Sequence, residues 1–486
     1  MFKRFLSNFK LKKSFFSFKN LLVYLMIFIS TTIFITGIWI KAKFGDVGFE
    51  GIVFTMKTPL DGVPMTLIFS YLRRLLISLA VSYIITILLV MYINKLPPKL
   101  YRAVLYVFIL LLIFLGSVYV TLTRFNNLSF YINTSYSDFV ENHYVKVDKN
   151  LKLDTNRKKN FILVALESVE STFVYDNYGL SYMKNLNQIS EQNISFRNQI
   201  QIFGTTNTVA GFTGQLFGIP LRIPIMSNRY GIFAEFLPNA PSVIDLLDNN
   251  DYNIAFILGG DSEFGGKDKV FKSHSTNPQV LDSTEYLKEW KNRKHYSKSW
   301  WGFKDQFIYE RAKELILGLS QEDKNFFTLI LTVDTHTPGQ PHGYYPPVFG
   351  DERDAFVEAD QLVAEFLSWL KTQPFYEDTV VVIMGDHLYM SNHIGPFKIP
   401  TEPRRTIYNA FINTGFEISK EKQLKTCSTL DMAPTILEAL GFNLPDHKFG
   451  LGVSLFSDLP TLVELYDETY LNEQLNARSA LYESFF

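Results

Sequence analysis

A single cysteine, Cys427, occurs among the 486 residues of this sequence. One cysteine can neither form a disulfide within the chain nor build a cysteine metal cage, which excludes disulfide-stapled, thioredoxin-like and zinc-ribbon folds. The chain also has almost no net charge, because 47 lysines and arginines face 48 aspartates and glutamates. Without a basic field, the composition gives no reason to expect a nucleic-acid partner.

Long apolar runs are present, and they lie in the first quarter of the chain. Residues 21–40, 75–93 and 103–122 form three uncharged runs, each near the roughly 20 residues that a helix needs to cross a bilayer. Buried core helices are the alternative, but three such runs rarely pack inside a soluble domain. The first run is also too long for a signal peptide and lacks a clear cleavage site. We therefore predict three transmembrane helices.

Basic residues beside these runs predict the orientation of the chain. Lysines and arginines gather before the first run and again between the second and third runs, at Lys95, Lys99 and Arg102. Because cytoplasmic flanks are rich in these residues, an odd number of spans leaves the remainder of the chain outside the cytoplasm. Arg73 and Arg74 lie on the opposite side of the second run and argue against this orientation.

The rest of the chain alternates short apolar runs with helix-like stretches. Polar residues 126–158 indicate a connector between a membrane domain at 1–125 and a globular domain at 159–486. Apolar runs of strand length cover 160–166, 252–258, 326–333, 378–384 and 407–413, and stretches such as 304–319 and 354–372 repeat apolar residues at helical spacing. This alternation predicts an α/β fold with a mostly parallel sheet that is flanked by helices.

Chemically active side chains follow four of these runs. They are Glu167, Asp261, Asp334, His336, Asp386 and His387. Since ligands of open α/β sheets bind at the carboxyl ends of the strands, carboxylates and imidazoles there suit a divalent cation. The alternative is that each residue only forms a turn or caps a helix. This alternative is weaker for Asp386 and His387, because histidine is not a favoured turn or cap residue.

Three threonines, Thr205, Thr206 and Thr208, cluster in the stretch FGTTNTVAGF. Asn207 or Thr206 can cap a helix that runs to Phe217 and ends at Gly218. The cluster is therefore either a polar helix start or the location of a nucleophile, and its pattern does not choose between them.

Five motifs, in this order, resemble the alkaline phosphatase/sulfatase-like superfamily. They are FILVALES, GTTNTVAG, TVDTHTPG, VVIMGDH and LDMAPTILEALGF. Their order and spacing resemble its membrane-bound phosphoglycerol and phosphoethanolamine transferases. The stretches WGFKDQFIYERA and TNTVAGFTGQLFGIPL look most like the phosphoglycerol transferases of periplasmic glucans, to which lipoteichoic acid synthases are related.

The resemblance implies a bacterial inner-membrane enzyme whose catalytic domain faces the periplasm. Its donor would be phosphatidylglycerol, and a glycan or lipid-linked hydroxyl would be the acceptor. The implied metal site consists of Glu167, Thr208, Asp386 and His387. It would hold one divalent ion, Mn²⁺ in the first place and Mg²⁺ or Zn²⁺ otherwise. Thr208 would be the nucleophile and would carry a phospho-threonine intermediate. A threonine hydroxyl is a weak nucleophile at neutral pH, and the bound metal ion would activate it.

Further residues of the resemblance concern the substrate. His336 matches the histidine that contacts the transferred phosphate or its leaving oxygen, and Asp261 and Lys267 match the stretch that holds the headgroup. His342 is a further candidate for substrate contact, with an ordinary loop position as the alternative. Lipoteichoic acid synthases carry Trp and Arg where this chain has glycines and Lys267, which favours single-unit transfer over polymerisation.

Other functions remain open at this point. A phosphoethanolamine transferase or a headgroup-releasing phosphodiesterase would use the same motifs. The lipid A branch of the phosphoethanolamine transferases usually carries several disulfides, which one cysteine does not allow. A catalytically inactive membrane scaffold is the third alternative, and the intact metal-site residues argue against it.

Overall fold

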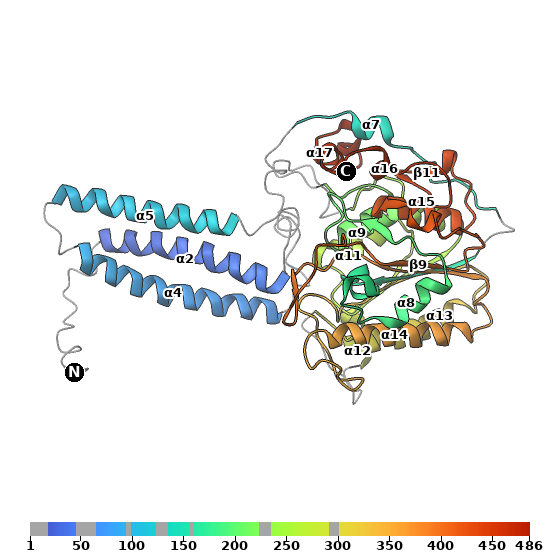
Figure 1. Cartoon of the computed structure of the whole chain (residues 1–486), viewed down its shortest axis with the longest axis horizontal. Coiled ribbons are helices and arrows are strands. Elements are labelled where there is room, and N and C mark those ends of the chain that lie inside the picture. The colour runs from blue at the N-terminus through green and yellow to red at the C-terminus, as the bar shows by residue number, and fades with distance from the viewer. Residues whose placement is uncertain are drawn as a thin grey trace. The chain divides into compact units, whose positions relative to one another are not determined.

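The computed structural model describes residues 18–44, 65–93, 99–122, 135–154, 159–222, 235–290 and 301–486, which divide into two units. The described residues of the first unit form three helices, α2 (Phe18–Phe44), α4 (Met65–Ile93) and α5 (Lys99–Leu122) (Figure 1). All three are long and apolar enough to cross a membrane. The three apolar runs are therefore helical, as the sequence predicts.

Polar side chains join two of these helices at their interface. The hydroxyl oxygen of Thr31 in α2 lies 2.9 Å from that of Ser78 and 2.6 Å from that of Ser82, both in α4. Hydroxyl pairs of this kind hold helices together where the surroundings offer no water. Large apolar side chains such as Leu76 and Tyr119 are exposed on the outside, which suits contact with lipid.

A six-stranded sheet with the order β4-β3-β5-β1-β6-β9 forms the centre of the second unit. Its strands are β1 (Asn160–Leu166), β3 (Asn253–Leu258), β4 (Gln279–Leu281), β5 (Phe326–Leu331), β6 (Thr379–Gly385) and β9 (Asn409–Ile412). Neighbouring strands are parallel except β9, which runs antiparallel to β6. The predicted α/β fold with a mostly parallel sheet is confirmed.

Helices cover both faces of this sheet (Figure 1). One layer contains α9 (Thr208–Phe217), α10 (Val243–Asp248), α11 (Lys267–Lys272) and α15 (Met432–Ala439), and the other contains α8 (Lys184–Gln192), α13 (Asp305–Leu319) and α14 (Asp354–Lys371). Leu163 of β1 packs into the first layer and its neighbour Val164 into the second. Because successive side chains point to opposite faces, a strand covered on both sides is apolar throughout.

Shorter elements complete the unit. They are the strand pairs β2 (Asn198–Ile200) and β10 (Thr426–Ser428), β7 (His393–Ile394) and β8 (Phe397–Lys398), and β11 (Lys448–Phe449) and β12 (Gly452–Val453), and the helices α7 (Phe139–His143), α12 (Ser283–Trp290), α16 (Leu462–Leu465), α17 (Glu468–Asn476) and α18 (Ala480–Glu483). The described residues 135–154 pack against the C-terminal part, where Tyr136 bridges Arg478 and Val145 pairs with Gly450.

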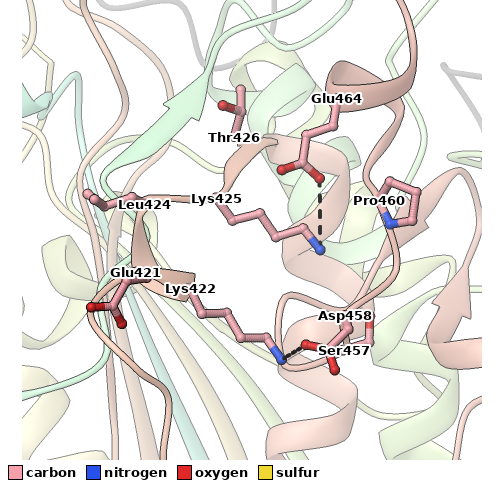
Figure 2. Close-up of a pocket in the computed structure, with 9 residues that line it drawn as sticks. All are labelled: Glu421, Lys422, Leu424, Lys425, Thr426, Ser457, Asp458, Pro460 and Glu464. Carbon is pink, nitrogen blue, oxygen red and sulfur yellow. Dashed lines mark hydrogen bonds and ion pairs between the residues drawn. The ribbon is translucent and has the colours of Figure 1, made fainter.

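A surface hollow lies beside the start of β10 (Figure 2). The amine of Lys422 is 2.8 Å from a carboxylate oxygen of Asp458, and that of Lys425 is 3.9 Å from Glu464. Both lysines are thus paired within the hollow, and no predicted site residue lines it. The hollow is therefore not the candidate active site.

Candidate active site

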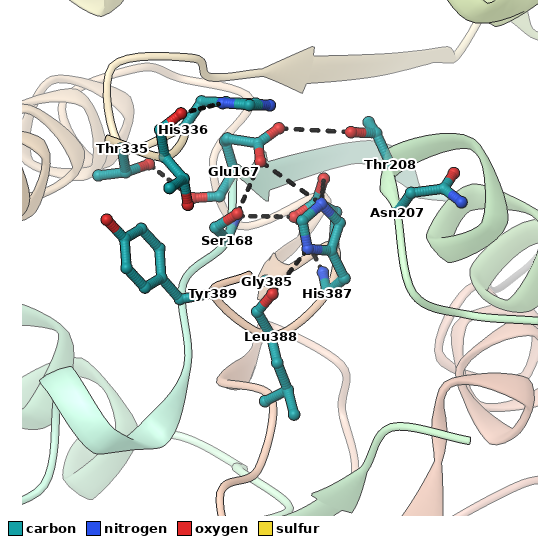
Figure 3. A network of polar contacts seen from close by, with 12 residues as sticks. Glu167, Ser168, Asn207, Thr208, Thr335, His336, Gly385, His387, Leu388 and Tyr389 are labelled. Atoms are coloured by element: carbon teal, nitrogen blue, oxygen red, sulfur yellow. Dashed lines mark hydrogen bonds and ion pairs between the residues drawn. The ribbon is translucent and has the colours of Figure 1, made fainter. Parts of the chain in front are cut away.

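Three predicted metal ligands meet at the carboxyl ends of two neighbouring strands. Leu166 of β1 is in register with Gly385 of β6, so the residues that follow, Glu167 and Asp386, emerge side by side. One ligand atom from each of Glu167, Asp386 and His387 lies within 4.8 Å of the others. All three side chains are buried. The strand register therefore assembles a compact, dry set of two carboxylates and one imidazole (Figure 3).

The imidazole of His387 is oriented by the backbone. Its Nδ1 lies 2.8 Å from the carbonyl oxygen of Leu388, which makes Nδ1 the protonated nitrogen. Its Nε2 then faces Glu167 Oε1 and Asp386 Oδ2, each at 3.4 Å. Neither His387 Nε2 nor Asp386 Oδ2 has a hydrogen-bond partner among the described residues.

The two carboxylates repel each other in the absence of a cation. Burial and the nearby charge of Glu167 raise the pKa of Asp386 to about 6. Buried polar atoms without partners are costly, and a bound cation would satisfy Asp386 Oδ2 and His387 Nε2 together. An oxygen- and nitrogen-rich donor set of this kind fits Mn²⁺, Mg²⁺ or Zn²⁺. The residues present therefore fit a divalent ion.

Thr208 is the first residue of α9, whose start faces this cluster. Asn207 is the N-cap, since its side-chain oxygen accepts a hydrogen bond from Ala210 N at 3.1 Å. The helix ends at Phe217, and Gly218 takes the left-handed conformation with φ of 63°. The predicted helix is confirmed, with Asn207 as its cap rather than Thr206. The hydroxyl of Thr208 donates to Glu167 Oε2 at 3.3 Å (Figure 3).

A glycine allows α9 to approach the cluster closely. A Cβ atom added to Gly211 would lie 2.3 Å from the carbonyl oxygen of Asp386, a distance that no side chain tolerates. Gly211 is one turn beyond Thr208, so this contact sets how near the helix start lies to the carboxylates. Free N–H groups at a helix N-terminus also favour a phosphate group.

A cavity of about 90 Å³ opens beside Glu167 and Thr208. Its lining residues are Glu167, Thr208, Leu258, Gly259, Gly260, Asp261, Phe264, Lys267, Trp301, Leu331, Thr332, Val333 and His336. The cavity thus brings together five of the predicted site residues from the ends of three strands and from α9 and α11.

Lys267 supplies a cationic group to this cavity. Burial lowers the pKa of its amine to about 8, against the opposing pull of Asp261 and Glu167. The amine lies 4.9 Å from the centre of the Phe264 ring and donates a hydrogen bond to the Phe264 carbonyl oxygen. With a pKa of about 8, most of the amine is protonated near neutral pH and can attract an anionic group.

His336 lies on another wall of the cavity and is neutral near neutral pH. Burial lowers its pKa to about 4. Its Nδ1 lies 3.0 Å from the carbonyl oxygen of Thr337, so in the neutral ring Nδ1 carries the proton and Nε2 is a free base. The ring packs against Trp301, with 4.1 Å between ring centres. His336 therefore has the protonation state that a general base needs.

Comparison with known proteins identifies the family. The sulfatase family profile matches residues 159–442, more than half of the chain. The chain belongs to the sulfatase family. This confirms the resemblance that the five motifs indicate.

Relatives of this sulfatase-family chain include proteins named phosphoglycerol transferase I. Those from Salmonella paratyphi B and Salmonella choleraesuis are both 28% identical to it, covering 72% and 71% of this chain but only 46% and 45% of their own length. The chain thus spans about half the length of the curated relatives it matches. A solved structure, the lipoteichoic acid synthase LtaP from Listeria monocytogenes, has a TM-score of 0.50 and 20% identity over 63% of this chain and 79% of its own, which supports the fold.

Two candidates from the sequence lie outside the cavity of this sulfatase-family site. His342 Nε2 contacts Asp334 Oδ1 at 2.8 Å, and Asp334 Oδ2 accepts a hydrogen bond from the first backbone N–H of α13, at Asp305. Asp334 thus binds a backbone N–H at the start of α13. Neither residue lines the cavity.

Sequence reasoning missed Trp301 and Phe264 as cavity residues. Trp301 precedes α13, and Phe264 lies in the loop after β3. Neither follows a strand directly, which was the signal that led to Glu167, Asp261 and His336. A search of the whole loop after β3 and of the helix starts would have included both aromatic side chains.

Proposed function

We propose that this sulfatase-family protein is a metal-dependent phosphoglycerol transferase that uses phosphatidylglycerol as its donor. The observation that carries this proposal is the hydroxyl of Thr208, which lies at a helix N-terminus, lines the cavity and contacts Glu167 of the candidate metal site. The relatives named phosphoglycerol transferase I support the choice of headgroup.

The reaction would proceed in two half-reactions on Thr208. In the first, Thr208 Oγ1 bonds to the phosphorus, the bond from phosphorus to the diacylglycerol oxygen breaks, and the proton that Glu167 takes from Thr208 passes on to the departing diacylglycerol oxygen. In the second, an acceptor hydroxyl bonds to the phosphorus, the bond to Thr208 Oγ1 breaks, and the proton that the acceptor loses returns to Thr208 Oγ1. Glu167 accepts the hydrogen bond of the Thr208 hydroxyl and is placed to take its proton.

The remaining cavity residues would bind the headgroup and handle the second proton. The amine of Lys267 attracts the anionic phosphodiester, and Asp261 is placed to accept hydrogen bonds from the glycerol hydroxyls. His336 Nε2 is unprotonated at neutral pH and would take the proton of the acceptor hydroxyl. His342, which contacts Asp334, supports the loop that carries His336.

Glu167, Asp386 and His387, with Thr208, are the residues that would hold the metal ion. When bound, such an ion lowers the pKa of a hydroxyl and offsets negative charge on phosphate.

We further propose a membrane domain at 1–125, a connector at 126–158 and a catalytic domain at 159–486, facing the periplasm of a bacterial inner membrane. The three apolar helices support membrane insertion, and a catalytic domain held at the membrane has direct access to a phospholipid donor. A glycan or lipid-linked hydroxyl of the cell envelope would be the acceptor.

Incubation of the full-length protein with labelled phosphatidylglycerol tests this proposal. With Mn²⁺, we expect diacylglycerol release and a glycerophosphate adduct on the Thr208 peptide in mass spectrometry. An adduct with phosphoethanolamine from mixed lipids would instead show a phosphoethanolamine transferase, and release without acceptor modification would show a phosphodiesterase. If Mn²⁺, Mg²⁺ and Zn²⁺ all give no diacylglycerol, the proposed function is wrong.

A further inference from the structure

Two buried carboxylates outside the proposed chemistry, Asp305 and Asp334, bind each other's backbone. The oxygens of Asp305 accept hydrogen bonds from Val333 N at 2.7 Å and from Asp334 N at 3.2 Å. Asp334 Oδ2 accepts in return from Asp305 N at 2.9 Å. We call this reciprocal pair the carboxylate clasp. It joins the start of α13 to the segment that follows β5.

Each side of the carboxylate clasp carries an aromatic ring of the cavity. Trp301 lies four residues before Asp305, and His336 lies two residues after Asp334. Their ring centres are 4.1 Å apart, with an angle of 40° between the planes. The clasp therefore joins the two chain segments that place these rings in contact.

Backbone contacts also fix the residues between Trp301 and the carboxylate clasp. Phe303 N donates to the carbonyl oxygen of Gly259 at 2.8 Å, which fixes the segment against the end of β3. A Cβ atom on Gly302 would lie 2.2 Å from the same oxygen, so the two backbones are packed with no room for a side chain. The backbone that follows Trp301 is thus held at Phe303 by Gly259 and at Asp305 by Asp334.

The carboxylate clasp joins the two segments at a high cost in desolvation free energy. Both carboxylates are buried, and burial together with their mutual repulsion raises the pKa of Asp305. Uncharged side chains would cap the same N–H groups at a lower desolvation cost. Such a costly arrangement next to a catalytic cavity indicates a role beyond capping.

We propose that Asp305 is a positioning residue, which through the carboxylate clasp holds Trp301 against His336 and so orients His336 Nε2 toward the acceptor. This inference rests on the proposed function, because it assigns the orientation of the proposed base. It predicts that loss of the clasp slows the half-reaction that needs this base and spares the attack by Thr208.

Burst kinetics of the full-length protein with bis(4-nitrophenyl) phosphate and Mn²⁺ separate the two half-reactions. Nitrophenolate leaves without a proton, so the burst reports attack by Thr208, and the later steady rate reports transfer to water. In Asp305→Ala we expect a burst rate within about threefold of wild type and a steady rate lower by roughly 30-fold. Asp305→Asn, which keeps one acceptor oxygen, should fall between Asp305→Ala and wild type.

Variants of Trp301 test whether Asp305 acts on His336 through the Trp301 ring. Trp301→Ala should reproduce the lower steady rate, whereas Trp301→Phe, which keeps a ring against His336, should lose much less. The double variant Asp305→Ala/Trp301→Ala should be no slower than either single variant, because both changes release the same ring. If the double variant lowered the steady rate by the product of the two single losses, Asp305 would not act through Trp301.

Asp360→Ala is the matched control. Asp360 is also a buried aspartate that accepts two backbone hydrogen bonds, from Asn185 N and Leu186 N, but it does not line the cavity. We expect Asp360→Ala to lower thermal stability and to leave both rates near wild type. Equal losses of burst and steady rate in Asp305→Ala would show that Asp305 only stabilises the fold. Absence of both a burst and an adduct on the Thr208 peptide in mass spectrometry would overturn the covalent step of the proposed function, whereas the steady rates of Asp305→Ala and Asp360→Ala would still test the clasp.

Discussion

Thr205 and Thr208 are three residues apart, yet their hydroxyls have different partners. Thr208 Oγ1 contacts Glu167 in the cavity, whereas Thr205 is buried and its hydroxyl donates to the carbonyl oxygen of Ile202 at 2.8 Å. We expect Thr208→Ala to abolish transfer and Thr208→Ser to retain part of it, because serine keeps a hydroxyl. Thr205→Ala should only weaken transfer through lost stability. Diacylglycerol release measures all three, and appreciable transfer by Thr208→Ala would exclude Thr208 as the nucleophile.

Metal binding should stabilise the fold through the buried ligands. Mn²⁺ at 100 times its dissociation constant would add about 2.7 kcal/mol to the free energy of unfolding, and a chelator would remove this gain. In Asp386→Asn the added Mn²⁺ should raise the melting temperature much less. Thermal unfolding with and without Mn²⁺ measures this difference. A wild-type melting temperature that does not respond to Mn²⁺, Mg²⁺ or Zn²⁺ would argue against a metal at these residues.

Asp334 should make stability depend on pH. Burial above all raises the pKa of Asp334 to about 8, well above its ordinary value in the unfolded chain. The folded state therefore binds this proton more tightly, and its contribution to stability is lost as pH rises from about 4 to about 8. Relative to Asp334→Asn, which has no proton to lose, the melting temperature of the wild type should fall between about pH 4 and about pH 8. A constant difference between the two proteins would contradict the raised pKa.

The sequence predicts which side chains lie together where those side chains directly follow neighbouring parallel strands. Glu167, Asp386 and His387 could be located because parallel neighbouring strands end at the same edge. Asp305 and Trp301 could not, since their partners Val333 and His336 are about thirty residues away in sequence and no strand end marks them.

At the scale of elements, the contact between α9 and the end of β6 should determine how Thr208 is presented. Gly211→Ala would place a methyl group 2.3 Å from Asp386 O, which forces the helix away. We expect a loss of about 1–3 kcal/mol in stability and a larger loss of transfer than of metal affinity. Gly318→Ala in α13 is the control, because nothing lies within 4 Å of the added Cβ, and alanine there should be neutral or stabilising by up to about 1 kcal/mol. Denaturant unfolding and diacylglycerol release measure both variants, and full transfer by Gly211→Ala would contradict this contact's role.

The elements that the sequence predicted are those with long apolar patterns. Strands β1, β5 and β6 are buried along their whole length, so composition alone reveals them. Strand β4 has three residues, none of them buried, and its sequence carries no strand pattern. The antiparallel direction of β9 also has no signal in its own residues, because direction is decided by the chain path between strands.

At the scale of the whole molecule, the number of membrane crossings decides on which side of the membrane the catalytic unit lies. The part of the chain that the structure describes contains three helices long and apolar enough to cross a membrane, and the basic residues that precede the first of them favour a cytoplasmic start. The C-terminus at Phe486 should therefore lie outside the cytoplasm. A reporter that is active only outside the cytoplasm, fused after Phe486, should give signal, and a cytoplasm-only reporter at the same position should not. The reverse result would place the cavity in the cytoplasm, away from any periplasmic glycan, and would exclude such an acceptor while leaving the proposed chemistry at Thr208 untouched.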